Sequence, residues 1–404
     1  MKIIYLHQYF NTPAMTGGTR SYEMARRFVD AGHEVHMITS WREPTKKSRW
    51  FKTVEDGINV HWLPLHYSNK MSFRERISAF FLFAFSASKK VVRLKGDIVF
   101  ATSTPLTIAL PAIYSARRLH VPMVFEVRDL WPELPIAVGA IKNPYIIKLA
   151  QWLERFAYKH STYVVALSPG MKKGVVKAGY PPEKISVIPN SSDIDLFQVS
   201  ESMGQSFLEQ YQNLKGGSLI VYAGTLGLIN GVSYLVEVAH FIKKIDKSIR
   251  FLIVGDGKEF EKVQQYAENM EVLNNNLWMI RALPKSEMPS LLSAATVSTS
   301  LVIDLPELWN NSANKFFDSL AAGKPLMINY SGWHADLLEK NNAGIVVPPD
   351  NAQIAAKMLY DFINNKERLQ QAGKAALHLA KQEFDRDQLA RNLLNVLEKA
   401  AQND

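Results

Sequence analysis

The sequence of 404 residues contains no cysteine. This absence excludes disulfide bonds, cysteine nucleophiles and cysteine metal ligands, and it is typical of proteins that fold in a reducing cytoplasm. No His-x-x-x-His or Gly-x-Ser-x-Gly pattern occurs, so no motif indicates a metal ion or a serine nucleophile. We expect chemistry that uses neither a metal nor a cofactor.

Long apolar segments are also missing. The start, "MKIIYLHQYF", has one lysine before a short mixed run, which is not the pattern of a signal peptide. The apolar run from Ile77 to Ala87 is too short for the ~20 residues of a membrane-spanning helix. We therefore expect a cytoplasmic protein.

Positive charge is in excess. The net charge is +9 and the pI is about 9.3, which attracts nucleic acid, acidic lipid or phosphorylated small molecules. No zinc-finger, basic-zipper or aromatic RNA-binding pattern occurs, and nucleic acid is not expected. In residues 69–95 basic residues flank the apolar run, which predicts either a core helix or a helix that lies on the inner face of an anionic membrane. In the second case the contacts would be Phe80, Phe81, Phe83, Lys89 and Lys90.

Strands alternate with helices twice along the chain. The first half contains "KIIYLH", "EVHMIT", "INVHWLP", "DIVFATS", "PMVFEVR", "YVVALS" and "ISVIPN"; the second contains "LIVYAG", "FLIVGDG", "LWMIRAL", "TVSTSLV", "PLMINY" and "GIVVPP". This pattern predicts an α/β protein with two Rossmann-like, doubly wound parallel-sheet domains that face each other across a cleft. The expected domains are 1–195 and 196–378, with the polar stretch 198–218 as their connection, and 379–404 as a helix that packs back on the first domain.

Ligands of open parallel sheets bind beyond the carboxyl ends of the strands, and three loops there carry polar or glycine residues. Gly17 and Gly18 precede a helix and allow either close approach to an anion or a simple flexible turn. In "FEVRDLWPELP", Arg128 and Asp129 follow an apolar strand. Arg128 could stabilise a leaving phosphate while Asp129 positions an acceptor hydroxyl, or Arg128 could form a surface ion pair with Asp129 or Glu133.

The third loop leads into a helix expected from Ser312 to Ala322. Asn314 and Asp318 would share one face of this helix, with Lys315 beside them. The free amides of the helix start and Lys315 would favour a phosphate, and Asp318 could accept hydrogen bonds from two ribose hydroxyls. The alternative is an ordinary amphipathic first turn.

Taken in order, several segments of the chain resemble the retaining glycosyltransferases of family 4, which have the two-domain GT-B fold. These segments are "YFNTPAMTGGTRSYEMARRFVDAGHEV", "VIPNSSDIDLF", "LIVYAGTLGLINGVSYLVEVA", "FLIVGDG" and "KFFDSLAAGKPLM". "FEVRDLWPE" and "NKFFDSLAAGKP" are most similar to the bacterial O-antigen and capsule subgroup, in particular to the L-fucosamine transferases.

The resemblance implies transfer of a sugar from a nucleotide diphosphate, with the glycine loop near the diphosphate and Asp318 at the ribose. The chain departs from the family pattern at three positions. The first of two family glutamates falls on Asn310, and the arginine and lysine that usually neutralise the diphosphate fall on Thr225 and Asn230. Replacement cations would be Arg128, Arg281 and Lys315.

From the resemblance we expect a retaining, metal-independent hexosyltransferase. It would move N-acetyl-L-fucosamine or another N-acetylated hexosamine from a UDP-sugar to a hydroxyl of a polyprenyl-diphosphate-linked sugar, at the inner face of the cytoplasmic membrane, in lipopolysaccharide O-antigen or capsule synthesis. The expected substrate-binding residues are Gly17, Gly18, Thr225, Arg281, Asn310, Asn314 and Lys315, and the catalytic ones Arg128, Asp129 and Asp318. A nucleotide-sugar 2-epimerase and a non-catalytic sugar-nucleotide-binding protein stay open as alternatives.

Overall fold

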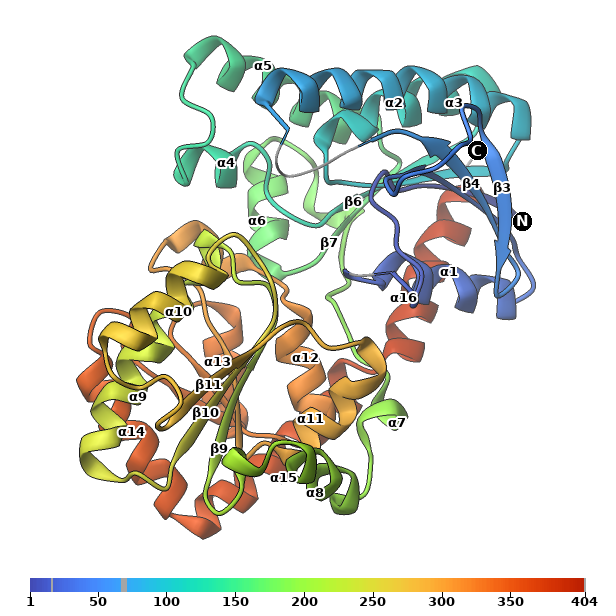
Figure 1. Ribbon diagram of the computed structural model, residues 1–404. Coiled ribbons are helices and arrows are strands. Elements are labelled where there is room, and N and C mark those ends of the chain that lie inside the picture. Colours follow the sequence, from blue (N-terminus) through green and yellow to red (C-terminus); the bar gives the residue numbers. More distant parts are fainter. Residues whose placement is uncertain (16, 67–70, 403–404) are drawn as a thin grey trace. The chain divides into compact units, whose positions relative to one another are not determined.

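The computed structural model describes residues 1–15, 17–66 and 71–402, and it divides into two compact units (Figure 1). Unit 1 comprises Met1–Pro189 and Asp387–Asp404, and unit 2 comprises Asn190–Arg386. The chain thus passes between the units twice, after Pro189 and after Arg386.

Unit 1 is built on an eight-stranded sheet in the order β3-β4-β2-β1-β5-β6-β7-β8. All neighbouring strands are parallel except β3 and β4, because the apolar strands of this half are joined by helices. The short edge strand β3 was missed in the sequence because its exposed and half-buried residues alternate. The strands are β1 (Lys2–Leu6), β2 (Glu34–Trp41), β3 (Phe51–Glu55), β4 (Ile58–Pro64), β5 (Ile98–Thr102), β6 (Met123–Val127), β7 (Tyr163–Ala166) and β8 (Ile185–Val187).

Helices cover both faces of this sheet. One face carries a core that includes Phe83 of α2 and Tyr158 of α5, and the other carries Phe28 of α1 and Leu393 of α16. The C-terminal helix therefore packs in unit 1. The helices of this unit are α1 (Arg20–Asp30), α2 (Phe73–Leu94), α3 (Ala109–Leu119), α4 (Glu133–Ala137), α5 (Pro144–Lys159), α6 (Pro169–Lys177) and α16 (Arg386–Gln402), whose first residue still belongs to unit 2.

Unit 2 is built on a six-stranded parallel sheet in the order β11-β10-β9-β12-β13-β14. Its strands are β9 (Leu219–Ala223), β10 (Arg250–Val254), β11 (Leu277–Ile280), β12 (Val297–Ser300), β13 (Leu326–Ile328) and β14 (Gly344–Val346). Its helices are α7 (Ile194–Phe197), α8 (Glu201–Gln210), α9 (Ser233–Ile245), α10 (Phe260–Asn269), α11 (Met288–Ala294), α12 (Asn314–Ala321), α13 (Trp333–Asn341), α14 (Ala352–Asn364) and α15 (Lys366–Glu383). The predicted fold class, two Rossmann-like α/β domains, is confirmed.

Two expectations about segments are wrong. The polar stretch 198–218 is not a free connection, because it forms α8 and buries Phe207 and Leu214 in the core of unit 2. In α2, Phe83 is not a membrane contact, because only 1% of its surface is exposed and it packs under the sheet. The fold places one side of α2 in the core.

The other expected membrane contacts of α2 differ among themselves. Phe81 and Lys89 are exposed, whereas Phe80 is half-buried. Lys90 is half-buried with its ammonium 5.8 Å from the ring centre of Trp50, and burial lowers its pKa, with a smaller effect from nearby Arg93. Residues 69 and 70 of the expected segment lie outside the described residues.

Within the described ranges, every helix is either too short or too polar to cross a bilayer.

Candidate functional site

In unit 1, the carboxyl ends of β1, β5 and β6 bring polar side chains together. Arg128 follows β6 and its Nη1 lies 3.4 Å from Nε2 of His7, which follows β1. The backbone N–H of Arg128 donates to Oγ of Ser103, which follows β5, at 3.0 Å. Beside it, the Thr104 hydroxyl lies 3.4 Å from a carboxylate oxygen of Asp129. Arg128 and Asp129 are therefore held at one edge of the sheet.

The electrostatics of this cluster differ from residue to residue. Burial, and then the positive charges of Arg128 and Arg42, hold the pKa of His7 well below its usual value, so the ring is neutral and can accept from Arg128. Burial also raises the pKa of Asp129, and the Arg128 charge opposes that effect. The predicted alternative partner Glu133 lies 3.8 Å from the Lys177 ammonium. The cluster thus offers one cation and one carboxylate to a ligand.

A buried ion pair between Arg20 and Glu126 lies next to this edge of the sheet. Nη2 of Arg20, in the first turn of α1, lies 2.9 Å from Oε1 of Glu126 on β6, and the other Glu126 oxygen accepts from Thr102 at 2.7 Å. Arg20 also donates to the carbonyls of Ile188 and Pro189 at the end of β8. Burial alone would raise the pKa of Glu126, but the charges of Arg20 and Arg128 turn the shift downward. The pair joins α1 to the centre of the sheet.

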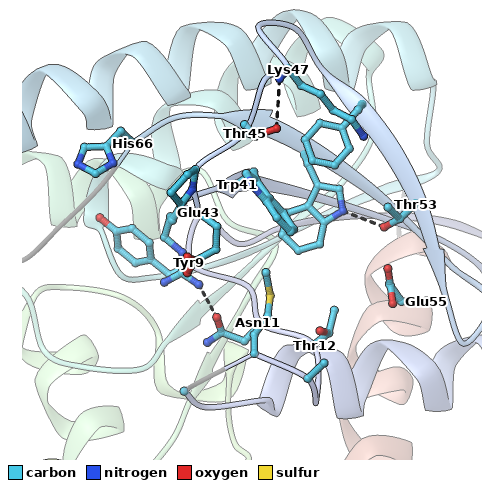
Figure 2. Close-up of a pocket in the computed structure, with 17 residues that line it drawn as sticks. Tyr9, Asn11, Thr12, Trp41, Glu43, Thr45, Lys47, Thr53, Glu55 and His66 are labelled. Carbon is cyan, nitrogen blue, oxygen red and sulfur yellow. Dashed lines mark hydrogen bonds between the residues drawn. The ribbon is translucent and has the colours of Figure 1, made fainter. Parts of the chain in front are cut away.

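The glycine loop borders a separate pocket of unit 1, with a volume of about 1280 Å³ (Figure 2). Gly17 has φ of +126°, and a side chain there would meet Nδ2 of Asn11 at 2.5 Å. Asn11 donates to the Gly18 carbonyl at 3.4 Å and accepts from Arg42. Glycine is therefore favoured at position 17, because L side chains rarely adopt this φ, and a larger residue would also displace the Asn11 side chain.

Aromatic rings form one wall of this pocket. Trp41 meets Trp62 edge to face at 5.2 Å, and Phe51 stacks on Trp62 at 6.4 Å between centroids. The Lys47 ammonium lies 3.8 Å from the centre of the Phe51 ring, and Trp62 donates to Thr53 at 2.8 Å (Figure 2). Aromatic faces beside a few polar groups are the composition of a ligand-binding pocket.

In unit 2, the start of α12 carries the predicted polar residues. The Asn311 side chain accepts from the Ala313 N–H at 3.2 Å, which sets the chain direction at the helix start. Phe316, Phe317 and Leu320 form the buried face, as expected for either interpretation of this segment. Asn314, Lys315 and Asp318 are half-buried on the other side.

Lys315 points to the carboxyl end of β9. Its ammonium donates to the Tyr222 hydroxyl at 3.0 Å, and that hydroxyl donates to the Thr225 carbonyl at 2.7 Å. A side chain added at Gly224 would meet Nζ of Lys315 at 3.4 Å. Burial lowers the pKa of Lys315 to about 7. An anion bound at the loop after β9 would thus restore the charge of a lysine already beside it.

Asp318 lies beside the chain segment that enters unit 2. Its Oδ1 accepts from the Ser192 hydroxyl at 2.7 Å. The Arg386 guanidinium donates hydrogen bonds to the residues on either side of Ser192, namely to the Asp193 carboxylate and the Ser191 carbonyl. Burial raises the pKa of Asp318, while the Ser192 hydrogen bond and the Arg386 charge act against this. Asp318 as a whole is half-buried, and one oxygen of its carboxylate is held by Ser192.

The remaining predicted residues of unit 2 lie at different places. Thr225 is exposed in the loop after β9, and Asn310 is half-buried at the end of the 3-10 turn Pro306–Asn310. Arg281 follows β11, where it forms salt bridges to Asp256 at 3.0 Å and Glu261 at 2.6 Å. Two carboxylates thus already balance this arginine, whereas the Lys315 ammonium lies at the Tyr222 hydroxyl beside the β9 loop.

Sequence reasoning missed His7, the aromatic wall and Tyr222. His7 and Trp41 directly follow or end the strands β1 and β2, and position at a strand end was the available signal. Tyr222 lies inside β9, where an apolar run gives no indication that its hydroxyl reaches a lysine. In the described parts of the chain, no three His, Asp or Glu side chains gather as a metal site would need.

Two family descriptions match consecutive parts of the chain. "Glycosyl transferase 4-like domain" matches residues 16–191, and "Glycosyl transferases group 1" matches residues 205–378. An Escherichia coli UDP-Gal:alpha-D-GlcNAc-diphosphoundecaprenol alpha-1,3-galactosyltransferase is 24% identical over 299 residues, which are 73% of this chain and 72% of that one. A Pseudomonas aeruginosa protein named "Probable glycosyltransferase WbjE" is 21% identical over 300 residues, 73% of each chain.

Solved structures share the fold over the whole length. HepE of Anabaena, in complex with UDP and glucose, has a TM-score of 0.74 at 16% identity and covers 99% of this chain and 100% of its own. Sucrose-phosphate synthase from Thermosynechococcus elongatus has a TM-score of 0.81 at 12% identity and covers 100% of both chains.

Proposed function

Because the chain belongs to the family 4 glycosyltransferases with the GT-B fold, we propose that it transfers a sugar from a UDP-sugar to a hydroxyl of a polyprenyl-diphosphate-linked sugar. The donor proposal draws on HepE, whose structure holds UDP and glucose, and the acceptor proposal on the E. coli relative, which is named for a diphosphoundecaprenol acceptor. The residues of unit 2 provide the chemical argument.

The donor diphosphate would bind at the loop after β9. The Lys315 ammonium lies there, and the amides at the start of α12 add partial positive charge. Asp318 would accept hydrogen bonds from the two ribose hydroxyls through the carboxylate that Ser192 orients. Lys315 beside the β9 loop is the single observation that carries the proposal, since it supplies the cation missing at Thr225 and Asn230.

Departure of UDP would place developing charge on the leaving phosphate, and cations can stabilise it. The bond from the sugar C1 to the phosphate oxygen breaks and a bond from C1 to the acceptor oxygen forms on the same face, while the acceptor proton passes to the departing phosphate. Arg128 would stabilise this charge and Asp129 would orient the acceptor. Side-chain cations take the place of a metal ion in this mechanism, so EDTA should leave the rate unchanged.

The acceptor sugar would bind in unit 1. The pocket beside Gly17 presents the rings of Trp41 and Phe51 to a ligand, and Asn11, Arg42 and Lys47 border it with polar groups. "FEVRDLWPE" and "NKFFDSLAAGKP" support N-acetyl-L-fucosamine or another N-acetylated hexosamine as the donor sugar. They also support a role in O-antigen or capsule assembly at the inner face of the membrane.

The test is a panel of UDP-sugars with and without a polyprenyl-diphosphate-linked acceptor. We expect UDP release and a product one sugar larger only when both substrates are present. Donor isomerised in the absence of acceptor would support the 2-epimerase instead. Binding of UDP-sugars without any turnover under all conditions would support a non-catalytic binding protein.

A further inference from the structure

Helix α5 turns apolar side chains outward. Tyr145, Leu149 and Trp152 are 81%, 61% and 54% exposed, and their spacing of four and three residues places them on one side of the helix. Ile146 is exposed beside them, while Ala157 and Tyr158 are buried on the opposite side. A surface helix normally exposes its polar side, so this stripe is of the kind that marks an interaction site.

Helices α2 and α3 extend the same surface. Phe81, Leu82 and Phe85 of α2 and Tyr114 of α3 are each more than half exposed. The buried sides of α2, α3 and α5 belong to one core cluster on one face of the sheet, and Figure 1 shows the three helices over that face. Their exposed sides therefore point away from the sheet together. We call this surface the aromatic face: Phe81, Leu82, Phe85, Tyr114, Tyr145, Ile146, Leu149 and Trp152.

The charged residues of these three helices are mostly positive. Their sequences contain ten lysines and arginines but only two glutamates, a net +8 of the +9 that the whole chain carries. Neither glutamate is free: Glu154 is buried and accepts from Tyr158 at 3.2 Å, and Glu75 closes the capping box with Ser72. The three helices that carry the aromatic face thus hold most of the excess positive charge of the chain.

Exposed aromatic rings with lysine and arginine beside them match the surface of an anionic bilayer. Tyr and Trp favour the headgroup region, apolar side chains enter the acyl boundary, and basic side chains are attracted by acidic lipid. Lys89 illustrates the combination, with its ammonium 4.1 Å from the Phe85 ring centre. A second copy of the chain fits poorly, because two such faces would bring like charges together.

We propose that the aromatic face docks the protein on an anionic lipid bilayer, with α5 as a main contact beside α2. The inference rests on the proposed function only in naming the bilayer as the one that carries the acceptor. It extends the sequence expectation, which was confined to residues 69–95. The buried Phe83 is no longer among the expected lipid contacts, and exposed side chains of α2, α3 and α5 take its place.

The test is flotation with vesicles of equal parts phosphatidylglycerol and phosphatidylethanolamine, in parallel with phosphatidylcholine vesicles. The full chain should float with the anionic vesicles, less well at high salt and poorly with phosphatidylcholine. Leu149→Ser with Trp152→Ser should reduce binding by about tenfold or more, because two large apolar side chains are removed from the contact. Ile245→Ser with Ile354→Ser is the matched control, because both residues are about half exposed in unit 2, and it should float like the wild type.

Several outcomes would overturn the proposal. They are no flotation of the wild type, equal flotation of the α5 variant, or an equal loss in the unit 2 control. Melting midpoints show whether the variants are folded; if the α5 pair is not, Phe81→Ser with Phe85→Ser takes its place. A wild-type dimer in sedimentation analysis that the α5 variant abolishes would make a second copy the occupant instead.

The assay is separate from catalysis because no nucleotide or acceptor is present. A protein that floats but transfers no sugar would contradict the proposed function and leave the docking face intact. Conversely, the α5 variant should keep its rate with a water-soluble acceptor that lacks the polyprenyl chain, and lose rate only with acceptor embedded in vesicles.

Discussion

At Lys315, burial and charge act against each other. The ammonium is held beside Tyr222, and burial brings its pKa to about 7, so near neutral pH a large part of this lysine is uncharged without a ligand. A bound diphosphate stabilises the protonated form and raises that pKa. The residue is thus suited to respond to an anion at the loop after β9.

This gives a pH prediction. The protonated lysine binds the anion, so UDP affinity should be high below pH 7 and fall as pH rises through the pKa of the free protein, by up to about tenfold per pH unit. Calorimetric titration between pH 7 and 9 avoids most of the phosphate ionisation itself, which lies near pH ~6. Lys315→Met should remove the slope; an unchanged slope in that variant would assign the titration to another group.

A change at Asp318 should affect the free energy of unfolding and the affinity for UDP differently. Burial raises its folded pKa, so its contribution to stability is present below the unfolded pKa and is lost as pH rises from the unfolded pKa through the folded one. Asp318→Asn should therefore leave the free energy of unfolding equal or higher at pH 7. The same change should weaken UDP binding by roughly 10- to 100-fold, since hydrogen bonds to a charged group are lost.

Urea unfolding and calorimetry check these two effects of Asp318→Asn. Asp361→Asn, at an exposed carboxylate of α14, should change neither quantity. A loss of stability without a loss of affinity would give Asp318 a purely structural role.

Arg128 is predicted to act on turnover. Arg128→Ala should lower kcat by about 10²- to 10³-fold with a small change in donor affinity, because its charge is used when the phosphate departs. Arg128→Lys should lie between, since it keeps the charge but not the geometry that places Nη1 beside His7. Unchanged kinetics in folded Arg128→Ala would remove this residue from the mechanism.

At the scale of elements, the Arg20–Glu126 pair connects α1 to β6 and to the end of β8. Arg20→Met would leave a buried carboxylate without its cation, and we expect a loss of about 3–5 kcal/mol in the free energy of unfolding. Arg26→Met breaks a partly exposed pair with Glu23 and should cost less than about 1 kcal/mol.

Urea unfolding monitored by circular dichroism distinguishes these variants of α1. Addition of Glu126→Gln to Arg20→Met should recover part of the stability, because the unpaired charge is then gone. Equal losses for Arg20→Met and Arg26→Met would contradict the structural role of the buried pair.

At the scale of the whole molecule, the two units have separate cores, and the proposed donor residues lie mainly in unit 2. UDP at about 100 times its Kd should stabilise the folded form by about 2.7 kcal/mol, as any ligand that binds only the folded state does. Differential scanning calorimetry should show this shift in the transition of unit 2, and Asp318→Ala should reduce it at the same UDP concentration. No shift at saturating UDP would contradict donor binding.

The sequence by itself determined the two parallel sheets and the helices between them, because buried strands separated by helical periodicity allow few other arrangements. It also indicated the loops that follow strands as the places for chemistry, since parallel strands end at a common edge. It failed at β3 and α8, where polar and alternating residues hide short elements that only packing stabilises.

Only the tertiary structure decided which side of each helix is covered. The phenylalanines of α2 are alike in sequence, yet Phe83 is buried and Phe81 and Phe85 are exposed. Tyr145, Leu149 and Trp152 of α5 have the spacing of a buried stripe, yet they face outward because the other side of the helix packs on the sheet. The same holds for Lys315 and Arg281, since contact with Tyr222 or with two carboxylates depends on strand order, which local sequence does not encode.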